Sequence, residues 1–173
     1  MERAVGYRRG VKRLWAPWRM AYVSDVPSAT GNECFLCAAA TGAEESLVVD
    51  RGPLAFILMN RFPYTSGHVM VVPVRHAPDV LAMTPDEGSA VFTATQRAIR
   101  VLADVMHPDG FNIGINQGSA AGASTEHVHQ HVVPRWAGDT NFMPVIGEVK
   151  VLPQDLETTA ANLREAFARL GPL

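Results

Sequence analysis

The sequence predicts an α+β fold built on an antiparallel sheet. Short apolar runs of strand length occur in two pairs, and each pair is joined by a short link rich in turn residues. One long amphipathic segment separates the two pairs, and another lies near the end of the chain. Parallel strands need long crossover connections, which these links do not provide. We therefore expect an antiparallel sheet with one long helix and a C-terminal helix, rather than a doubly wound parallel fold.

The first pair of strands follows a strand-like stretch that begins at Leu47. Its members are the continuous apolar run Leu54–Met59 and the run His68–Val72. Residues 60–67, which lie between them, are rich in turn formers. The two runs are therefore predicted to pair as antiparallel neighbours.

The long helix is predicted to begin after Thr84 and to run to about Met106. Thr84 is a favoured capping residue and Pro85 suits the first turn, where two acidic residues follow it near the positive end of the helix dipole. One face of this segment is formed by Val91, Ala94, Thr95, Ala98 and Leu102. His107 stands at the end of the helix, where a cation suits the dipole, and is expected to be structural.

The second pair of strands is predicted at Phe111–Asn116 and Val128–Val133. A loop rich in glycine and serine, residues 117–126, joins them. The last amphipathic helix fits Asp155–Leu170.

The first 30 residues form a basic and aromatic arm, and residues 31–173 form one domain. The cations of the arm are Arg3, Arg8, Arg9, Lys12, Arg13 and Arg19. Residues 1–12 are expected to be a solvated arm. Residues 14–23 hold two tryptophans and a tyrosine, which are costly to expose, so this segment is expected to pack on the domain or on a partner subunit.

The composition is that of an ordinary globular chain. Its 173 residues are 47% hydrophobic and 18% charged, and the net charge is −2. This charge argues against a general nucleic-acid binder, which needs surplus cations for phosphates. Since no apolar run reaches membrane-spanning length and no hydrophobic signal core follows the N-terminal arginines, we expect a cytoplasmic protein that does not enter membranes.

Half of the six histidines stand at positions 127, 129 and 131. On a helix successive ones would lie about 200° apart. On a strand they would project from one face, about 7 Å apart, and the neighbouring valines and Pro134 favour the strand. Each imidazole needs partners for two ring nitrogens, so a core would not collect three of them for packing. The cluster predicts a functional site.

Two kinds of chemistry fit such a cluster. Strand histidines spaced two apart can bind zinc. Alternatively, the middle imidazole can attack phosphorus while its neighbours orient it and manage protons. The three histidines alone do not distinguish these possibilities.

The motif His127-Val128-His129-Gln130-His131-Val132-Val133 resembles the signature of the histidine triad (HIT) family, with Gln130 in place of one hydrophobic residue. The similarity covers most of residues 34–134. It includes segments where that family places its nucleotide site: Leu58-Met59-Asn60, Ser66-Gly67-His68-Val69, Asn116, and Gly122-Ala123-Ser124. The resemblance implies a HIT-like five-stranded antiparallel sheet and a homodimer.

The resemblance also implies roles for single residues. His129, the middle histidine, is the implied nucleophile, and Asn60 the ribose ligand. The ribose and phosphate pocket is implied to be shaped by His68, Asn116, Gly122 and Ser124. Amide, hydroxyl and loop N–H groups suit this task, because uncharged donors stabilise charge that moves onto the bridging oxygen. His131 is placed to donate a proton to the phosphate or the leaving group.

The Cys34-Phe35-Leu36-Cys37 segment is a candidate metal half-site, and a tetrahedral zinc needs two further ligands. Bacterial HIT proteins and related galactose-1-phosphate uridylyltransferases are similar, and this resemblance supplies His76 and His127. It implies a structural zinc on Cys34, Cys37, His76 and His127, which leaves His129 and His131 for chemistry. A redox pair is disfavoured, because such a pair normally opens a helix in a βαβ setting.

The segments that flank the triad resemble the bacterial HIT branch of diadenosine tetraphosphate phosphorylases and hydrolases. They are residues 14–20, 135–142 and 147–154. This implies a nucleotidyl hydrolase or transferase that cleaves a phosphoanhydride of adenine dinucleotides and binds AMP on His129. Ala123 stands where many HIT hydrolases have a glutamine that helps to position water, so phosphate and water both remain open as acceptors. A nucleotide-binding sensor or scaffold protein and a three-histidine metallohydrolase are the alternatives.

Overall fold

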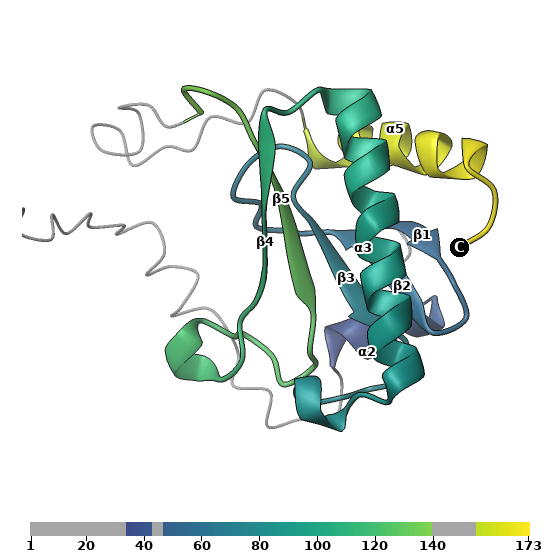
Figure 1. Ribbon diagram of the computed structural model, residues 1–173, viewed down its shortest axis with the longest axis vertical. Coiled ribbons are helices and arrows are strands. Elements are labelled where there is room, and N and C mark those ends of the chain that lie inside the picture. Colours follow the sequence, from purple (N-terminus) through teal and green to yellow (C-terminus); the bar gives the residue numbers. More distant parts are fainter. Residues whose placement is uncertain (1–33, 43–46, 140–154) are drawn as a thin grey trace, which may run out of the picture.

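The computed structural model describes residues 34–42, 47–139 and 155–173. Within these residues five strands form one antiparallel sheet, in the order β1-β2-β3-β5-β4 (Figure 1). The strands are β1 (Val48–Arg51), β2 (Ala55–Met59), β3 (Val69–Pro73), β4 (Gly110–Ile115) and β5 (Gln130–Arg135). The predicted α+β class and antiparallel sheet are confirmed. The basic arm and the tryptophan segment lie outside the described residues.

Three α-helices accompany the sheet: α2 (Phe35–Thr41), α3 (Pro85–Met106) and α5 (Leu156–Arg169). Two short 3₁₀ helices lie at Val80–Ala82 and Ser119–Ala121. The predicted start of α3 is confirmed in detail, because Thr84 and Glu87 form a reciprocal capping box. The sequence analysis did not predict α2. None of the helices in the described parts of the chain is long and apolar enough to cross a membrane.

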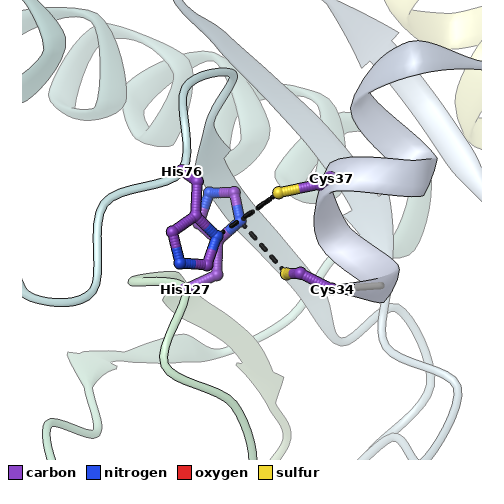
Figure 2. A group of neighbouring side chains, drawn as sticks. All are labelled: Cys34, Cys37, His76 and His127. Atoms are coloured by element: carbon purple, nitrogen blue, oxygen red, sulfur yellow. Dashed lines mark hydrogen bonds between the residues drawn. The ribbon is translucent and has the colours of Figure 1, made fainter. Parts of the chain in front are cut away.

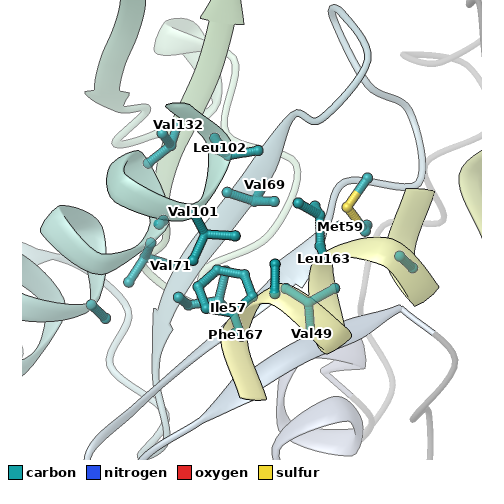
Figure 3. Close-up of a cluster of buried hydrophobic side chains, with 14 of the residues drawn as sticks. Val49, Ile57, Met59, Val69, Val71, Val101, Leu102, Val132, Leu163 and Phe167 are labelled. Atoms are coloured by element: carbon teal, nitrogen blue, oxygen red, sulfur yellow. The ribbon is translucent and has the colours of Figure 1, made fainter. Parts of the chain in front are cut away.

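Apolar side chains cover both faces of the sheet, and all residues of β2 and β3 are buried. On one face, α3 and α5 pack over the cluster of Figure 3, which includes Ile57, Val71 and Phe167. On the other face, α2 contributes Leu36 and Ala39 to a smaller cluster with the alternate residues of β2 and β3. Burial on both faces explains why these strands are continuous apolar runs rather than alternating ones.

The last strand was predicted to begin at Val128, but β5 begins at Gln130. The ladder between β3 and β5 ends at the pair Val71–Gln130, so only His131 of the triad lies on a strand. Pro73, at the end of β3, has no N–H to continue the ladder. Its carbonyl oxygen instead lies 3.0 Å from His127 Nε2, and the Val128 N–H donates to Ala77 O at 2.8 Å. The three histidines therefore do not share one strand face.

Gly67, directly before His68, has a φ of +76°, which glycine adopts without the steric cost of a side chain. A Cβ at this position would collide with the Met106 sulfur and would also press on Leu102 Cδ2. The backbone that leads to His68 thus passes directly against the last turns of α3.

Gln130 faces α3. Its Nε2 donates to Thr95 Oγ1 at 2.9 Å, and this buried hydroxyl donates to the Val91 carbonyl at 2.8 Å. The polar residue that departs from the family pattern is therefore paired with a polar residue of the helix above it.

This pairing predicts the outcome of two substitutions. Thr95→Val removes the acceptor of the Gln130 amide and is expected to lower the free energy of unfolding by about 1–3 kcal/mol. Adding Gln130→Leu replaces both partners with apolar groups and is expected to recover most of this loss. Urea unfolding of the wild type, both single variants and the double variant measures the coupling. Strictly additive losses would contradict it.

Candidate active site and metal centre

Two cysteines and two histidines from three separate segments meet at one end of the sheet (Figure 2). Cys34 caps α2 and Cys37 lies in its first turn, whereas His76 follows β3 and His127 precedes β5. One ligand atom from each residue lies within 4.8 Å of all the others. The structure thus brings together all four residues that the resemblance assigned to a metal.

The ring nitrogens of His127 are distinguished by their neighbours. A carbonyl oxygen only accepts, so Nε2 carries the proton that is donated to Pro73 O. Nδ1 is then a lone-pair donor, 3.4 Å from Cys34 Sγ and 3.5 Å from Cys37 Sγ. Burial lowers the pKa of His127 to about 4, which keeps the ring neutral near pH 7. A neutral ring with its lone pair aimed at two thiols is a ready metal ligand.

The spacing of these donor atoms fits a tetrahedral zinc. Bonds of about 2.3 Å to sulfur and about 2.0–2.1 Å to nitrogen place neighbouring ligand atoms roughly 3.3–3.8 Å apart. His76 Nδ1 lies 3.3 Å from Cys37 Sγ. This distance, and the distances of 3.4 Å and 3.5 Å from His127 Nδ1 to the two sulfur atoms, are close to that range. Among the described residues, this is the one group of three or more histidine, cysteine, aspartate or glutamate side chains that could hold a metal ion.

The Cys37 thiol does not have the lowered pKa of a reactive cysteine. Burial, together with the neighbouring Cys34, raises the pKa of the Cys37 thiol, whereas reactive cysteines have a lowered pKa. The pair does open a helix, α2, but this helix leads into the antiparallel strand β1 rather than into a parallel βαβ unit.

The segment of His76 is held to α3 by a forked ion pair. Arg75 Nε and Nη2 each donate to one carboxylate oxygen of Glu87 at 2.7 Å. Glu87 also accepts the Thr84 N–H that begins the helix. The guanidinium of Arg75, followed by these helix contacts, lowers the pKa of Glu87 to about 2. The carboxylate therefore joins the start of α3 to the residue before a metal-site histidine.

His129 is connected to the cluster through the backbone. Its Nδ1 lies 2.8 Å from the carbonyl oxygen of His127, so Nδ1 carries the proton and donates it there. Nε2 is left with a lone pair. The side chain is 4% exposed, and burial lowers its pKa, so the ring is neutral. A neutral, oriented imidazole with an unprotonated Nε2 is competent as a nucleophile.

His131 and His68 form a second connected pair. Tyr64 N–H donates to His68 Nδ1 at 3.0 Å, so the proton of the neutral His68 ring is on Nε2. His68 Nε2 lies 3.0 Å from His131 Nδ1, which accepts, and this leaves the His131 proton on Nε2. Burial, and then the neighbouring His129, lowers the pKa of His131 to about 4. The His131 ring contacts the His129 ring edge to face, with centroids 4.9 Å apart.

The orientation of the Asn60 amide is set by the link that follows β2. Phe62 N–H donates to Asn60 Oδ1 at 2.9 Å, which turns Nδ2 toward His68 Nε2 at 3.5 Å. Both of these nitrogens are donors and 3.5 Å is long for a hydrogen bond, so the Asn60 N–H groups remain directed toward the site.

The other predicted nucleotide ligands lie on the loop between β4 and β5. Ile115 pairs with Gln130, so Asn116, the next residue, emerges beside the segment of His129. Gly122 has a φ of +92°, and a Cβ there would lie 3.7 Å from Asn116 Nδ2. Ser124 is half-buried on the same loop. These residues approach the triad from the β4 side, whereas Asn60 and His68 approach it from the β2–β3 link.

Sequence reasoning missed one residue of this arrangement. Tyr64 stacks on His68 with ring centroids 4.9 Å apart and an interplanar angle of 14°. The sequence signal was only that an aromatic residue precedes His68 by four positions in a turn.

Comparison with known proteins agrees with this geometry. The model of the HIT domain family matches residues 41–138. An "AP-4-A phosphorylase" of Mycobacterium tuberculosis is 43% identical over 97% of this chain and 90% of that protein. A "Bis(5'-nucleosyl)-tetraphosphatase [asymmetrical]" of Schizosaccharomyces pombe is 32% identical, over 70% of this chain and 64% of that protein.

A solved structure has the same fold. The zinc-bound histidine triad family protein from Mycobacterium smegmatis superposes with a TM-score of 0.67 and 30% identity. The match covers 80% of this chain and 95% of that one.

The lowered pKa of Glu87 predicts a pH-dependent contribution to stability. Because the pKa falls from its usual 4.5 to about 2 on folding, the contribution is fully present above about pH 4.5. It is lost as the pH falls toward 2. Glu87→Gln removes this titration, so the difference in unfolding free energy between wild type and variant should shrink over that window. Urea unfolding between about pH 3 and 7 tests this, and a constant difference would contradict it.

Proposed function

Because the chain belongs to the histidine triad family, we propose that it cleaves a phosphoanhydride of diadenosine polyphosphates, diadenosine tetraphosphate among them, through a nucleotidyl intermediate on His129. One observation carries the proposal: the His127 carbonyl holds the proton of His129 on Nδ1, which leaves a lone pair on the buried Nε2. The names of the mycobacterial and yeast relatives support the substrate class.

The first step transfers a nucleotidyl group to the protein. His129 Nε2 attacks the α-phosphorus, an Nε2–P bond forms, and the bond to the bridging oxygen breaks. The leaving nucleotide, ATP in the case of diadenosine tetraphosphate, departs with its negative charge, and His131 Nε2–H donates a hydrogen bond to the oxygen on which this charge develops. The amide of Asn60 binds the ribose, while Asn116, Ser124 and the backbone at Gly122 supply uncharged donors to the phosphate. His68 positions His131.

The second step releases the nucleotide to an acceptor. We propose inorganic phosphate, because Ala123 has no side-chain amide to position water and the mycobacterial relative is named a phosphorylase. Attack of phosphate on the phosphoramidate breaks the Nε2–P bond and yields ADP. Water would yield AMP instead.

The ring directions disfavour a three-histidine metal site. His127 Nδ1 faces the two cysteines, while the His129 Nδ1 proton is donated to a carbonyl. The three rings therefore do not converge on one point.

We also propose that Cys34, Cys37, His76 and His127 hold one structural zinc per chain. The donor set of two thiols and two neutral imidazoles is typical of such sites, and the mycobacterial neighbour is a zinc-bound protein. The metal would stabilise the end of β3 and the segment that leads to His129.

We propose a homodimer in which β4 meets its counterpart in a second copy of the chain. β4 stands at the edge of the sheet, and within the described residues it pairs only with β5. Ile113 and, on α3, Phe92 are 48% and 63% exposed. An exposed edge strand of this kind is a template for pairing with another chain. α5, by contrast, packs on β1 within its own chain, at the opposite edge of the sheet.

Substitution of the two catalytic histidines tests the proposed reaction. His129→Ala is expected to abolish turnover of diadenosine tetraphosphate while AMP binding remains, because the ribose and phosphate donors are unchanged. His131→Ala is expected to lower kcat by about 10²–10³-fold, the usual range for loss of one hydrogen-bond donor to a developing oxyanion.

Acid quenching with radiolabelled nucleotide should trap label on the wild type and none on His129→Ala. Product analysis with phosphate present should give ATP and ADP, and AMP would identify water as the acceptor. Substantial turnover by His129→Ala, or inversion at phosphorus, would refute the covalent route. Saturable AMP binding without turnover of any anhydride would identify a sensor.

Metal analysis tests the zinc site. Protein purified without chelators should contain one zinc per chain, and Cys34→Ser with Cys37→Ser should lose the metal and melt at a lower temperature. Wild type stripped with a chelator and reloaded with zinc is the control and should recover its melting temperature. Absence of zinc from the purified wild type would show that the assignment is wrong.

Light scattering tests the dimer. The wild type should have the mass of two chains at micromolar concentration, and Ile113→Glu should reduce it to one, because the charge would be buried at the edge contact. Leu54→Glu, at a residue of similar exposure in the link between β1 and β2, is the matched control and should remain dimeric. A monomeric wild type would contradict the proposal.

A further inference from the structure

Tyr64 contacts His68 in two independent ways. Its backbone N–H donates to His68 Nδ1 at 3.0 Å, and its ring lies nearly parallel to the imidazole, 4.9 Å away between centroids. The tyrosine ring also lies 6.2 Å from the His131 ring, tilted by 49°. One residue of the β2–β3 link therefore borders both members of the His68–His131 pair.

The two contacts constrain different properties of His68. The N–H selects which nitrogen is unprotonated, because an amide can only donate. The stacked ring holds the imidazole in one plane, in which Nε2 is directed at His131 Nδ1, 3.0 Å away. His68 is fully buried, so water does not replace either partner if the ring turns.

The location of the His131 proton depends on this orientation. While His68 Nε2 donates to His131 Nδ1, the neutral His131 ring carries its own proton on Nε2. If the His68 ring leaves this plane, the donor at His131 Nδ1 is lost and the ring can carry its proton on either nitrogen. A His131 ring with its proton on Nδ1 cannot donate a hydrogen bond from Nε2 to the leaving group.

We propose that Tyr64 is a positioning residue, which by stacking on His68 keeps the His68–His131 hydrogen bond aligned and so holds the proton of His131 on Nε2. The contacts that align the His68 ring with His131 do not depend on which reaction the protein catalyses. Their effect on rate rests on the proposed function, in which His131 donates a hydrogen bond to the leaving nucleotide.

Nitrogen-15 NMR of histidine-labelled protein reads the tautomers directly. In the wild type, two-bond proton–nitrogen spectra should show His68 and His131 each protonated on Nε2. Tyr64→Ala should give His131 as a mixture of tautomers, whereas Tyr64→Phe keeps the stacking ring and should restore the wild-type spectrum. A wild type with His68 protonated on Nδ1 would overturn the proposal without any variant.

Kinetics supply the second readout. Tyr64→Ala should lower kcat by about two- to tenfold, as expected for loss of one aromatic contact, with KM nearly unchanged. Tyr64→Phe should recover kcat. A raised KM with unchanged kcat would overturn the proposal, because it would mean that the ring binds the nucleotide. If Tyr64→Ala fails to fold, Tyr64→Leu, which keeps apolar volume without a π face, takes its place and the same outcomes decide. If the wild type cleaves no anhydride, the proposed function fails, and the tautomer spectra still decide the role of Tyr64.

Discussion

The hydrogen bond from His129 Nδ1 to the carbonyl of His127 is the interaction on which the site depends. The side chain of His127 belongs to the cysteine–histidine cluster, and its backbone belongs to the nucleophile. For one residue to serve both, its segment must leave the sheet before β5 begins. The fold achieves this by ending β3 at Pro73, whose carbonyl meets the His127 ring, and by pairing Val128 with Ala77. Only Val128 therefore separates His127 of the cluster from the proposed nucleophile, His129.

Proton positions at the site are determined by backbone groups that can only accept or only donate a hydrogen bond. Two carbonyl oxygens determine the tautomers of His127 and His129, and one amide N–H determines that of His68. Burial then lowers the pKa of each triad histidine, which keeps all three rings neutral near pH 7. In the proposed function, neutral rings in these tautomers supply one metal ligand, one nucleophile and one hydrogen-bond donor from three identical side chains. The division of labour comes from the surroundings of each ring and not from its chemistry.

Local sequence signals predicted the parts of the fold that local interactions determine. The start of α3 was predictable, because Thr84 and Glu87 cap the helix within one turn of chain. The buried strands β2 and β3 were predictable from their uninterrupted apolar runs. The start of β5 was not, because it depends on Pro73, more than fifty residues earlier in the chain. The spacing of Cys34 and Cys37 marked them as a candidate metal half-site, but His76 and His127 came from resemblance, since nothing local relates them to the cysteines. The stack of Tyr64 on His68 depends on the path of a turn, which residue type does not reveal.

The close approach of Gly67 to Met106 has a consequence for how such chains can diverge. A side chain at Gly67 would have to displace the Met106 side chain and press on Leu102, and it would adopt a strained positive φ. Substitutions at Gly67 and at Met106 therefore constrain each other, although residues at a helix terminus and in a turn usually vary freely. Lineages that lengthen, shorten or repack the end of this helix would have to do so without moving it toward the turn. The segment that carries His68 thereby constrains the packing at the far end of a long helix.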